Sequence, residues 1–159
     1  MPTVRSEFVE VVLFKWTSAG PKYLILQRAG TEWVYPNLWQ FVTGRIDEGE
    51  TGIEAAHREL KEETKLIPIR FWNVPFIPSF YDQAVDAVFL NPIFAAEVLE
   101  RAEPQLSSEH QQYRWLDYEE ARSLLVWPNN HDALRLIHTY IVAGKDVAQF
   151  SEVRLIRKE

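Results

Sequence analysis

Carboxylate side chains are concentrated in the 23-residue window from Gly44 to Leu66, GRIDEGETGIEAAHRELKEETKL. Seven acidic and four basic residues give this window a net charge of −3, half of the −6 carried by the whole chain. Hard cations such as Mg²⁺ and Mn²⁺ prefer carboxylate oxygens, keep several waters and accept substrate phosphates as remaining ligands. The window is therefore a candidate metal site acting on a phosphate-bearing molecule.

A helix is expected over about residues 51–65, and Pro68 prevents it from continuing far. At the helical repeat, four apolar side chains share one arc and predict the core-facing stripe: Ile53, Ala56, Leu60 and Ile67. Three acidic side chains lie on the arc beside that stripe: Glu59, Glu62 and Glu63.

Like charges three or four residues apart on a helix repel each other by a few tenths of a kcal/mol per pair. A bound cation would remove that repulsion, whereas an ordinary surface helix alternates its charges. Spacing alone leaves both interpretations open, a metal site and a solvated amphipathic helix.

Eight positions of the window resemble the Nudix box, a signature that runs from a glycine to an apolar residue. They are Gly44, Glu50, Arg58, Glu59, Leu60, Glu62, Glu63 and Leu66. One position departs from the pattern: Lys65 stands where the family usually has the glycine that caps the helix. This departure puts the end of the helix in doubt, not the chemistry.

The resemblance implies an α+β fold, the Nudix-type α/β/α sandwich with a mixed β-sheet, as a single domain over residues 1–159. It also implies Mg²⁺ or Mn²⁺ as the cofactor. Glu59 and Glu63 match the principal metal ligands, and the Gly44 carbonyl commonly joins them. Glu62 matches an additional ligand or hydrogen-bonding partner.

Arg58 resembles the arginine that pairs with the glutamate at Glu50 and orients the metal-binding side chains. Glu59, Glu62, Glu63 and Arg58 are thus the expected catalytic residues of the box. The chemistry implied is hydrolysis of a diphosphate linkage, in which a carboxylate takes the proton of the attacking water.

Two further segments, Leu38–Gly44 (LWQFVTG) and Ser108–Asp117 (SEHQQYRWLD), resemble bacterial dihydroneopterin triphosphate pyrophosphatases, also described as dATP pyrophosphohydrolases. In that group the glutamate before the histidine of the late loop is a third metal ligand, which corresponds to Glu109. Without the resemblance, Glu109 would be read as a solvated loop acid. The implied products are pyrophosphate and a nucleoside-type monophosphate.

Four residues outside the box are candidates for substrate binding: Arg28, Trp39, Gln40 and Thr43. Arg28 closes a strand and could meet phosphates bidentately. Trp39 could stack on a pterin or purine ring, and Gln40 and Thr43 could hydrogen-bond a base or phosphate. The alternatives are an exposed strand-end charge for Arg28 and a core position for Trp39.

Other functions remain open. Within the superfamily, the substrate could be a dinucleoside polyphosphate, a nucleotide sugar or an oxidised nucleotide. A non-catalytic Nudix-fold ligand sensor is a different class, but such domains typically lose box carboxylates that this chain keeps.

The composition of the chain limits the number of domains, the kinds of functional site and the partners that can be expected. The 159 residues suit one domain, and the absence of cysteine excludes disulfides, thiolate metal sites and thiol nucleophiles. Apolar runs are too short for a membrane span, and Met1–Glu10 lacks the apolar stretch of a signal peptide. A net charge of −6 argues against nucleic-acid binding. We expect a cytoplasmic protein with a small phosphate-containing substrate, and a homodimer is one assembly the sequence allows.

The remaining elements follow from apolar patterning and turn residues. Strands are expected over residues 7–16, 22–28, 38–43, 84–99 and 113–116, with an irregular or edge strand over 71–81. Asn91-Pro92 is expected to form a bend or bulge within the strand over 84–99. Helices are expected over 117–125 and 130–143, and the tail to Glu159 could add a strand. One mixed sheet flanked by helices is the expected architecture.

Overall fold

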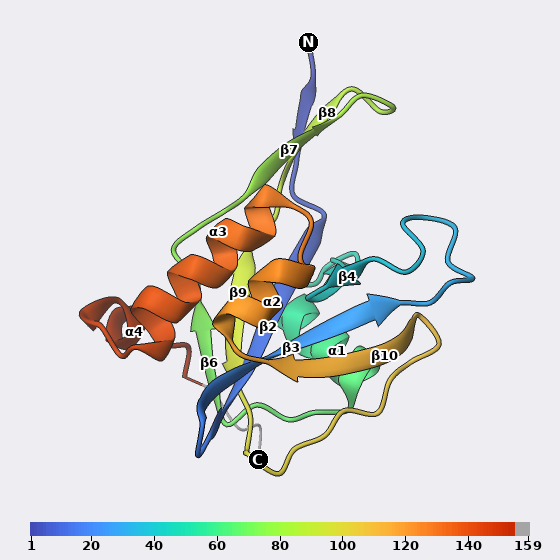
Figure 1. The fold of residues 1–159 in the computed structure, drawn as a ribbon. Coiled ribbons are helices and arrows are strands. Elements are labelled where there is room, and N and C mark those ends of the chain that lie inside the picture. Colours follow the sequence, from blue (N-terminus) through green and yellow to red (C-terminus); the bar gives the residue numbers. More distant parts are fainter. Residues whose placement is uncertain (155–159) are drawn as a thin grey trace.

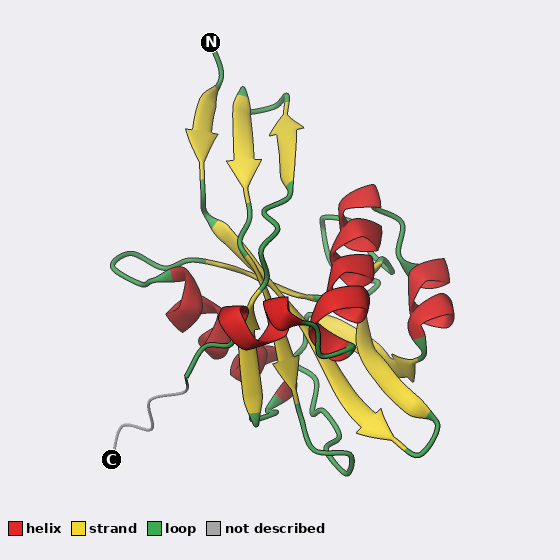
Figure 2. Ribbon diagram, turned by 90° about the vertical axis from the view of Figure 1, so that its left-hand side faces the viewer, coloured by secondary structure: helices red, strands yellow, loops and turns green. Residues whose placement is uncertain are grey.

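The computed structural model describes residues 1–154 and has three layers, with a mixed sheet between helices (Figures 1 and 2). The seven strands of the central sheet are β2 (Phe8–Thr17), β3 (Gly20–Arg28), β4 (Trp39–Gln40), β5 (Val42–Arg45), β6 (Arg70–Asn73), β9 (Ile93–Glu97) and β10 (His110–Leu116). Their main order is β10-β3-β2-β9-β6, while β4 pairs with β3 and β5 pairs with β2. β2 and β9 are parallel, so the sheet is mixed, as predicted.

Helices cover both faces of this sheet. They are α1 (Gly52–Thr64), α2 (Tyr118–Leu124), α3 (Pro128–Leu136), a π-helical continuation η1 (Ile137–Val142), and α4 (Asp146–Ser151). Alternate residues of β2 divide between the two faces. Val9, Val11 and Leu13 pack with α1, whereas Val12 and Phe14 pack with α2 and α3. The α+β sandwich expected from the sequence is confirmed.

A second sheet projects from the body (Figure 2). It has three strands, β1 (Thr3–Arg5), β8 (Ala87–Leu90) and β7 (Ser79–Asp82), in the order β1-β8-β7. Phe89 stacks on Phe80 at 5.1 Å between ring centroids and contacts Phe8 at 5.6 Å. This cluster ties the small sheet to the start of β2.

The expectation of one sheet, with one strand over 84–99, was wrong. Asn91 and Pro92 separate β8 from β9, and the two strands belong to different sheets. Proline has no amide hydrogen to give to a ladder, and the Asn91 amide instead donates to the Pro78 carbonyl at 3.1 Å. The predicted strand over 71–81 divides in the same way into β6 and β7.

The C-terminal expectations were partly wrong. The last long helix begins at Pro128, because proline fits the first helical turn, and continues as the π-helix η1. The tail forms α4 and one isolated bridge, between Trp72 and Glu152, in place of a strand. The rest of that predicted strand, residues 155–159, lies outside the described residues. Within residues 1–154, none of the helices is long and apolar enough to cross a membrane.

Candidate metal and catalytic site

The helix α1 begins and ends through local contacts of its own sequence. At its start, the Thr51 hydroxyl accepts from the Glu54 amide at 3.3 Å, and the Glu54 carboxylate accepts from the Thr51 amide at 2.9 Å. This capping box satisfies amides that would otherwise lack partners. At its end, Lys65 adopts a left-handed conformation, φ 59°, so the helix stops without the usual glycine.

The buried face of α1 consists of Ala55, Ala56, Leu60, Glu63 and Thr64. Two residues of the predicted stripe are wrong, because Ile53 is 39% exposed and Ile67, which is 79% exposed, lies beyond the end of the helix at Thr64. The helix is rotated about its axis relative to that expectation, which turns its acidic side toward the sheet. Glu63 therefore lies within the contact face, not beside it.

Glu63 is a carboxylate buried without a partner. It is 2% exposed, and neither side-chain oxygen is hydrogen-bonded by any described residue. His110 Nδ1 lies 3.9 Å away, beyond hydrogen-bond distance. Burial, followed by the charges of Glu109 and Glu59, raises the pKa of Glu63 to about 9. The Thr43 amide favours the charged form but does not reach ordinary hydrogen-bond geometry.

Arg58, in the middle of α1, hydrogen-bonds acidic residues both before the helix and within it. Its Nε and Nη2 each donate to the Glu50 carboxylate at 2.9 Å, a bidentate pair. The Arg58 hydrogen bond lowers the pKa of Glu50. Nη1 donates to Glu59 at 2.7 Å and to Glu62 at 3.3 Å, and Nη2 also donates to the Arg45 carbonyl at 2.7 Å. The pairing predicted between Arg58 and Glu50 is present.

Glu59 occupies space that only a glycine at position 44 leaves free. A Cβ atom on Gly44 would lie 1.9 Å from Glu59 Cδ and 2.3 Å from Oε1. The Glu59 side chain is 13% exposed, and burial raises its pKa although Arg58 opposes the shift. Gly44 thus forms the wall against which this carboxylate rests.

Glu109 approaches the same centre from the loop before β10. Its charge raises the pKa of both Glu59 and Glu63, although Glu109 itself is exposed. The Glu109 carbonyl accepts from the Ala29 amide at 2.8 Å, so the loop end is fixed to the end of β3. The charge of the late-loop acid therefore acts on the two buried box glutamates.

The carboxylate oxygens of these side chains are ligands of the kind that a hard divalent cation prefers. Glu63 presents buried oxygens that have no hydrogen-bond donor among the described residues, and the charges of neighbouring acids help to raise the pKa of Glu59 and of Glu63. Within residues 1–154, no three acidic or histidine side chains converge as a ready-made cation cage. Arg58 accounts for part of this, because it already pairs with Glu59 and Glu62.

The predicted substrate residues are only partly gathered at this centre. Gln40 Nε2 lies 3.0 Å from His110 Nε2, and Thr43 approaches Glu63 through its amide. Trp39 is half-buried against the core on the α2 and α3 side. The three residues precede the box glycine by one residue (Thr43), four residues (Gln40) and five residues (Trp39).

Arg28 is engaged by its own loop. Its Nε donates to the Val34 carbonyl at 2.8 Å, and Nη2 pairs with Glu32 at 3.3 Å. Its positive charge still lowers the pKa of Glu63 and of His110. Arg28 is therefore near the acidic centre, but its donors are directed at the 29–38 loop.

Two polar residues, the buried His110 and the half-buried Glu10, were not identified as site residues from the sequence. His110 is 5% exposed, and burial lowers the pKa of its imidazole to about 4, so the ring is neutral near pH 7. Glu10 lies opposite Thr43 in the β2–β5 ladder and accepts from Asn130 at 3.3 Å. Burial raises the pKa of Glu10 to about 7. An acid inside the apolar run FVEVVLF was the available signal for Glu10.

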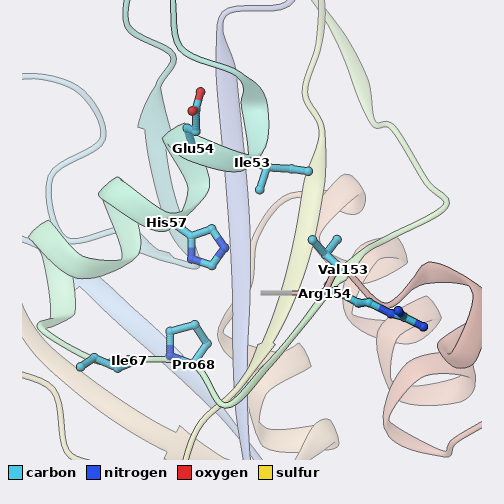
Figure 3. A pocket seen from close by; sticks show the side chains of 7 residues that line it. All are labelled: Ile53, Glu54, His57, Ile67, Pro68, Val153 and Arg154. Atoms are coloured by element: carbon cyan, nitrogen blue, oxygen red, sulfur yellow. The ribbon is translucent and has the colours of Figure 1, made fainter. Parts of the chain in front are cut away.

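A pocket of about 550 Å³ lies elsewhere on α1 (Figure 3). It is lined by Ile53, Glu54, His57, Ile67, Pro68, Val153 and Arg154. None of the clustered acids borders it, so this hollow and the carboxylate centre are separate features.

The NUDIX domain model matches residues 8–139, which include the acidic window and the Glu109 loop. The chain therefore belongs to the Nudix family of hydrolases.

Three curated relatives bear different names. An octanoyltransferase of Myxococcus xanthus is 34% identical over 123 residues, 73% of this chain and 31% of the relative. An RNA pyrophosphohydrolase of Bartonella bacilliformis is 28% identical over 124 residues, 65% of this chain and 71% of the relative. The dihydroneopterin triphosphate diphosphatase of Escherichia coli is 38% identical over 58 residues, 36% of each chain. The match thus spans about a third of the Myxococcus and Escherichia proteins.

Among solved structures, a NUDIX hydrolase from Listeria monocytogenes superposes with a TM-score of 0.73 and 25% identity. The match covers 95% of this chain and 100% of the Listeria chain. The similarity in fold therefore extends over nearly the whole chain.

We predict that Gly44→Ala displaces the Glu59 carboxylate, because the added methyl group overlaps Glu59 Cδ. Mn²⁺ affinity of the substrate-free protein should fall by about tenfold or more, the scale found for disturbed metal-ligand support. Gly52→Ala is the matched control, since its Cβ would meet only ordinary contacts at 3.8 Å and beyond. Parent-like affinity in Gly44→Ala would contradict this role of the glycine.

We also predict that Glu63 makes the metal-free protein less stable as pH rises. The pKa of Glu63 is about 9 in the folded state and 4.5 ordinarily, so its favourable contribution is complete below pH 4.5 and is lost as pH rises through 9. Near pH 9, the free energy of unfolding measured with urea should be at least about 1 kcal/mol higher for Glu63→Gln than for the parent protein. This difference should become smaller as the pH is lowered toward 5. Glu48→Gln, at an exposed site, should keep the parent's pH dependence.

Proposed function

We propose that the chain is a Mg²⁺- or Mn²⁺-dependent pyrophosphohydrolase, organised as a single Nudix domain over residues 1–159. Family membership supports hydrolysis of a diphosphate linkage. The observation that carries the proposal is the Glu63 carboxylate, which is buried with no hydrogen-bond partner among residues 1–154 and lies one helical turn after Glu59 on α1. Buried charges of one sign are tolerated only when a counter-charge accompanies them.

Glu59, Glu63 and Glu109, with the Gly44 carbonyl, are the proposed cation ligands, and Glu62 supports them. When bound, the cation neutralises phosphate charge and lowers the pKa of a bound water. Arg58 orients Glu59 through its hydrogen bond at 2.7 Å and is itself held by Glu50.

The protein supplies proton transfer and exclusion of water. One carboxylate of this set, in the box or in the late loop, accepts the proton of the water that attacks phosphorus. The P–O–P bond breaks, and the leaving phosphate takes the bonding electrons. The buried setting of Glu63 strengthens electrostatic interactions with the developing charge.

For the substrate we propose a nucleoside-triphosphate-like molecule, either dihydroneopterin triphosphate or a (d)NTP such as dATP. The products would be pyrophosphate and a monophosphate. The match to the Escherichia diphosphatase supports this choice. Trp39, Gln40 and Thr43 lead into the box and are the proposed base and phosphate contacts, and Arg28 contributes positive charge nearby.

Two alternatives differ in measurable ways. A dinucleoside polyphosphate, nucleotide sugar or oxidised nucleotide would place the same carboxylates on a different substrate. A non-catalytic ligand sensor would bind without turnover, and retention of Glu59, Glu62 and Glu63 favours the enzyme. An acidic chain with a cation-dependent site suits a small phosphate-containing partner better than nucleic acid. A cytoplasmic location and a homodimeric assembly are further parts of the proposal.

We predict that the purified protein with Mg²⁺ converts dATP to dAMP and pyrophosphate, resolved from orthophosphate by product analysis. Glu63→Gln should lower turnover by roughly two orders of magnitude or more, as expected for loss of a group in a metal centre, while remaining folded. Glu48→Gln removes the same charge at an exposed position and should retain activity.

Near-normal turnover by Glu63→Gln would remove the carboxylate centre from the mechanism. A panel of dATP, diadenosine tetraphosphate, ADP-ribose and 8-oxo-dGTP separates the substrate alternatives. Binding without turnover of any of them would favour the sensor.

We predict that Glu109→Ala is strongly impaired, because the late-loop carboxylate shares the centre with Glu59 and Glu63. Steady-state kinetics across Mn²⁺ concentrations should show a higher metal requirement, by roughly tenfold or more. Glu100→Ala, an exposed acid in the same loop, is the control. A neutral Glu109→Ala would remove the assignment to the dihydroneopterin triphosphate group but leave the Nudix chemistry.

A further inference from the structure

The loop between β9 and β10, residues 98–109, carries Glu109 to the acidic centre past the C-terminal end of α1 (Figure 1). The Gln105 amide donates to the Thr64 carbonyl at 2.8 Å, and the Ser107 amide to the Glu63 carbonyl at 3.4 Å. These are carbonyls of the last helical turn, which have no partner within a helix. The β9–β10 loop therefore caps the helix that bears the glutamates.

Glu103, in the middle of this loop, accepts from three side-chain donors of the central sheet. Its Oε1 accepts from Lys15 Nζ at 3.0 Å. Its Oε2 accepts from the Tyr113 hydroxyl at 3.0 Å and from Trp115 Nε1 at 3.1 Å. Lys15 belongs to β2 and the two aromatic residues to β10, so one carboxylate joins the loop to two strands.

Lys15 stabilises the ion pair with Glu103 because its ammonium group is buried and needs an anion beside it. It is 5% exposed, its Nζ also donates to the Ala102 carbonyl at 3.2 Å, and it lies 4.3 Å from the centre of the Trp115 ring. A buried ammonium without an anion is costly. Burial would raise the pKa of Glu103, but hydrogen bonds from Lys15 and Tyr113 outweigh it and leave the pKa below its usual value.

Apolar contacts reinforce the same attachment. Ala102 and Leu106, on either side of Glu103, pack against the core cluster that also contains Leu60 of α1. Pro104 is buried beside them. The segment from Ala102 to Ser107 is thus held on one side by the sheet and on the other by the end of α1.

We propose that Glu103 is a positioning residue, whose carboxylate fixes the β9–β10 loop on Lys15, Tyr113 and Trp115 so that Glu109 reaches the box glutamates. The inference rests on the proposed function, in which Glu109 is a cation ligand. Glu103 itself does not touch the centre, and its effect is transmitted through the six-residue connection to Glu109.

A carboxylate is the group that suits this position. All three partners are donors, and two acceptor oxygens can serve them together. Glutamine would keep the shape but place an NH₂ group against at least one donor. Glu103→Gln therefore releases the loop without removing bulk.

The test is a double-mutant cycle on Mn²⁺ affinity, measured on the substrate-free protein by electron paramagnetic resonance of unbound Mn²⁺. Glu103→Gln should weaken binding about fivefold, within the range for residues coupled in one network. Tyr113→Phe, which removes one donor to Glu103, should produce a smaller loss and serves if Glu103→Gln does not fold. Glu100→Gln should bind as the parent does.

Glu103→Gln combined with Glu109→Gln should bind no more weakly than Glu109→Gln alone, because the first residue acts through the second. Additive losses, or parent-like affinity in both Glu103→Gln and Tyr113→Phe, would overturn the inference. Parent-like affinity in Glu109→Gln would overturn it together with the role of Glu109. A parent protein that binds no Mn²⁺ would instead overturn the proposed function.

Discussion

The constraint on which the rest depends is the burial of Glu63 against the sheet among other acids. A carboxylate at 2% exposure without a hydrogen-bond partner among the described residues is unfavourable unless it is protonated or accompanied by a cation. The raised pKa of Glu63 favours the protonated carboxyl group when no metal is bound, and the proposed metal ion would stabilise the ionised carboxylate. A helix selected only for stability would place an apolar side chain here.

The surrounding structure keeps this unfavourable group in place. Arg58 donates short hydrogen bonds to both Glu50 and Glu59. Gly44 leaves the space that Glu59 occupies. The β9–β10 loop closes the last turn of α1 and delivers Glu109. Each support comes from a different part of the chain, and together they hold the acidic centre between α1, β5 and the loop before β10.

The sequence predicted what local patterns determine. The helix expected over 51–65 is observed at Gly52–Thr64, because a capping box and a left-handed Lys65 define its ends locally. The rotation of that helix against the sheet depends on tertiary packing, so the burial of Glu63 was not foreseen. The separation of β8 from β9, and the capture of Arg28 by the Val34 carbonyl, likewise depend on contacts distant in sequence or on loop conformation.

Anomalous diffraction from a crystal soaked in Mn²⁺ tests the central claim most directly, because it locates the cation and its ligands in one experiment. We expect an anomalous peak within coordinating distance of Glu63 and Glu59, with both Glu63 oxygens no longer lacking partners. A well-ordered crystal with no peak there, and Glu63 still buried and unaccompanied, would contradict the account.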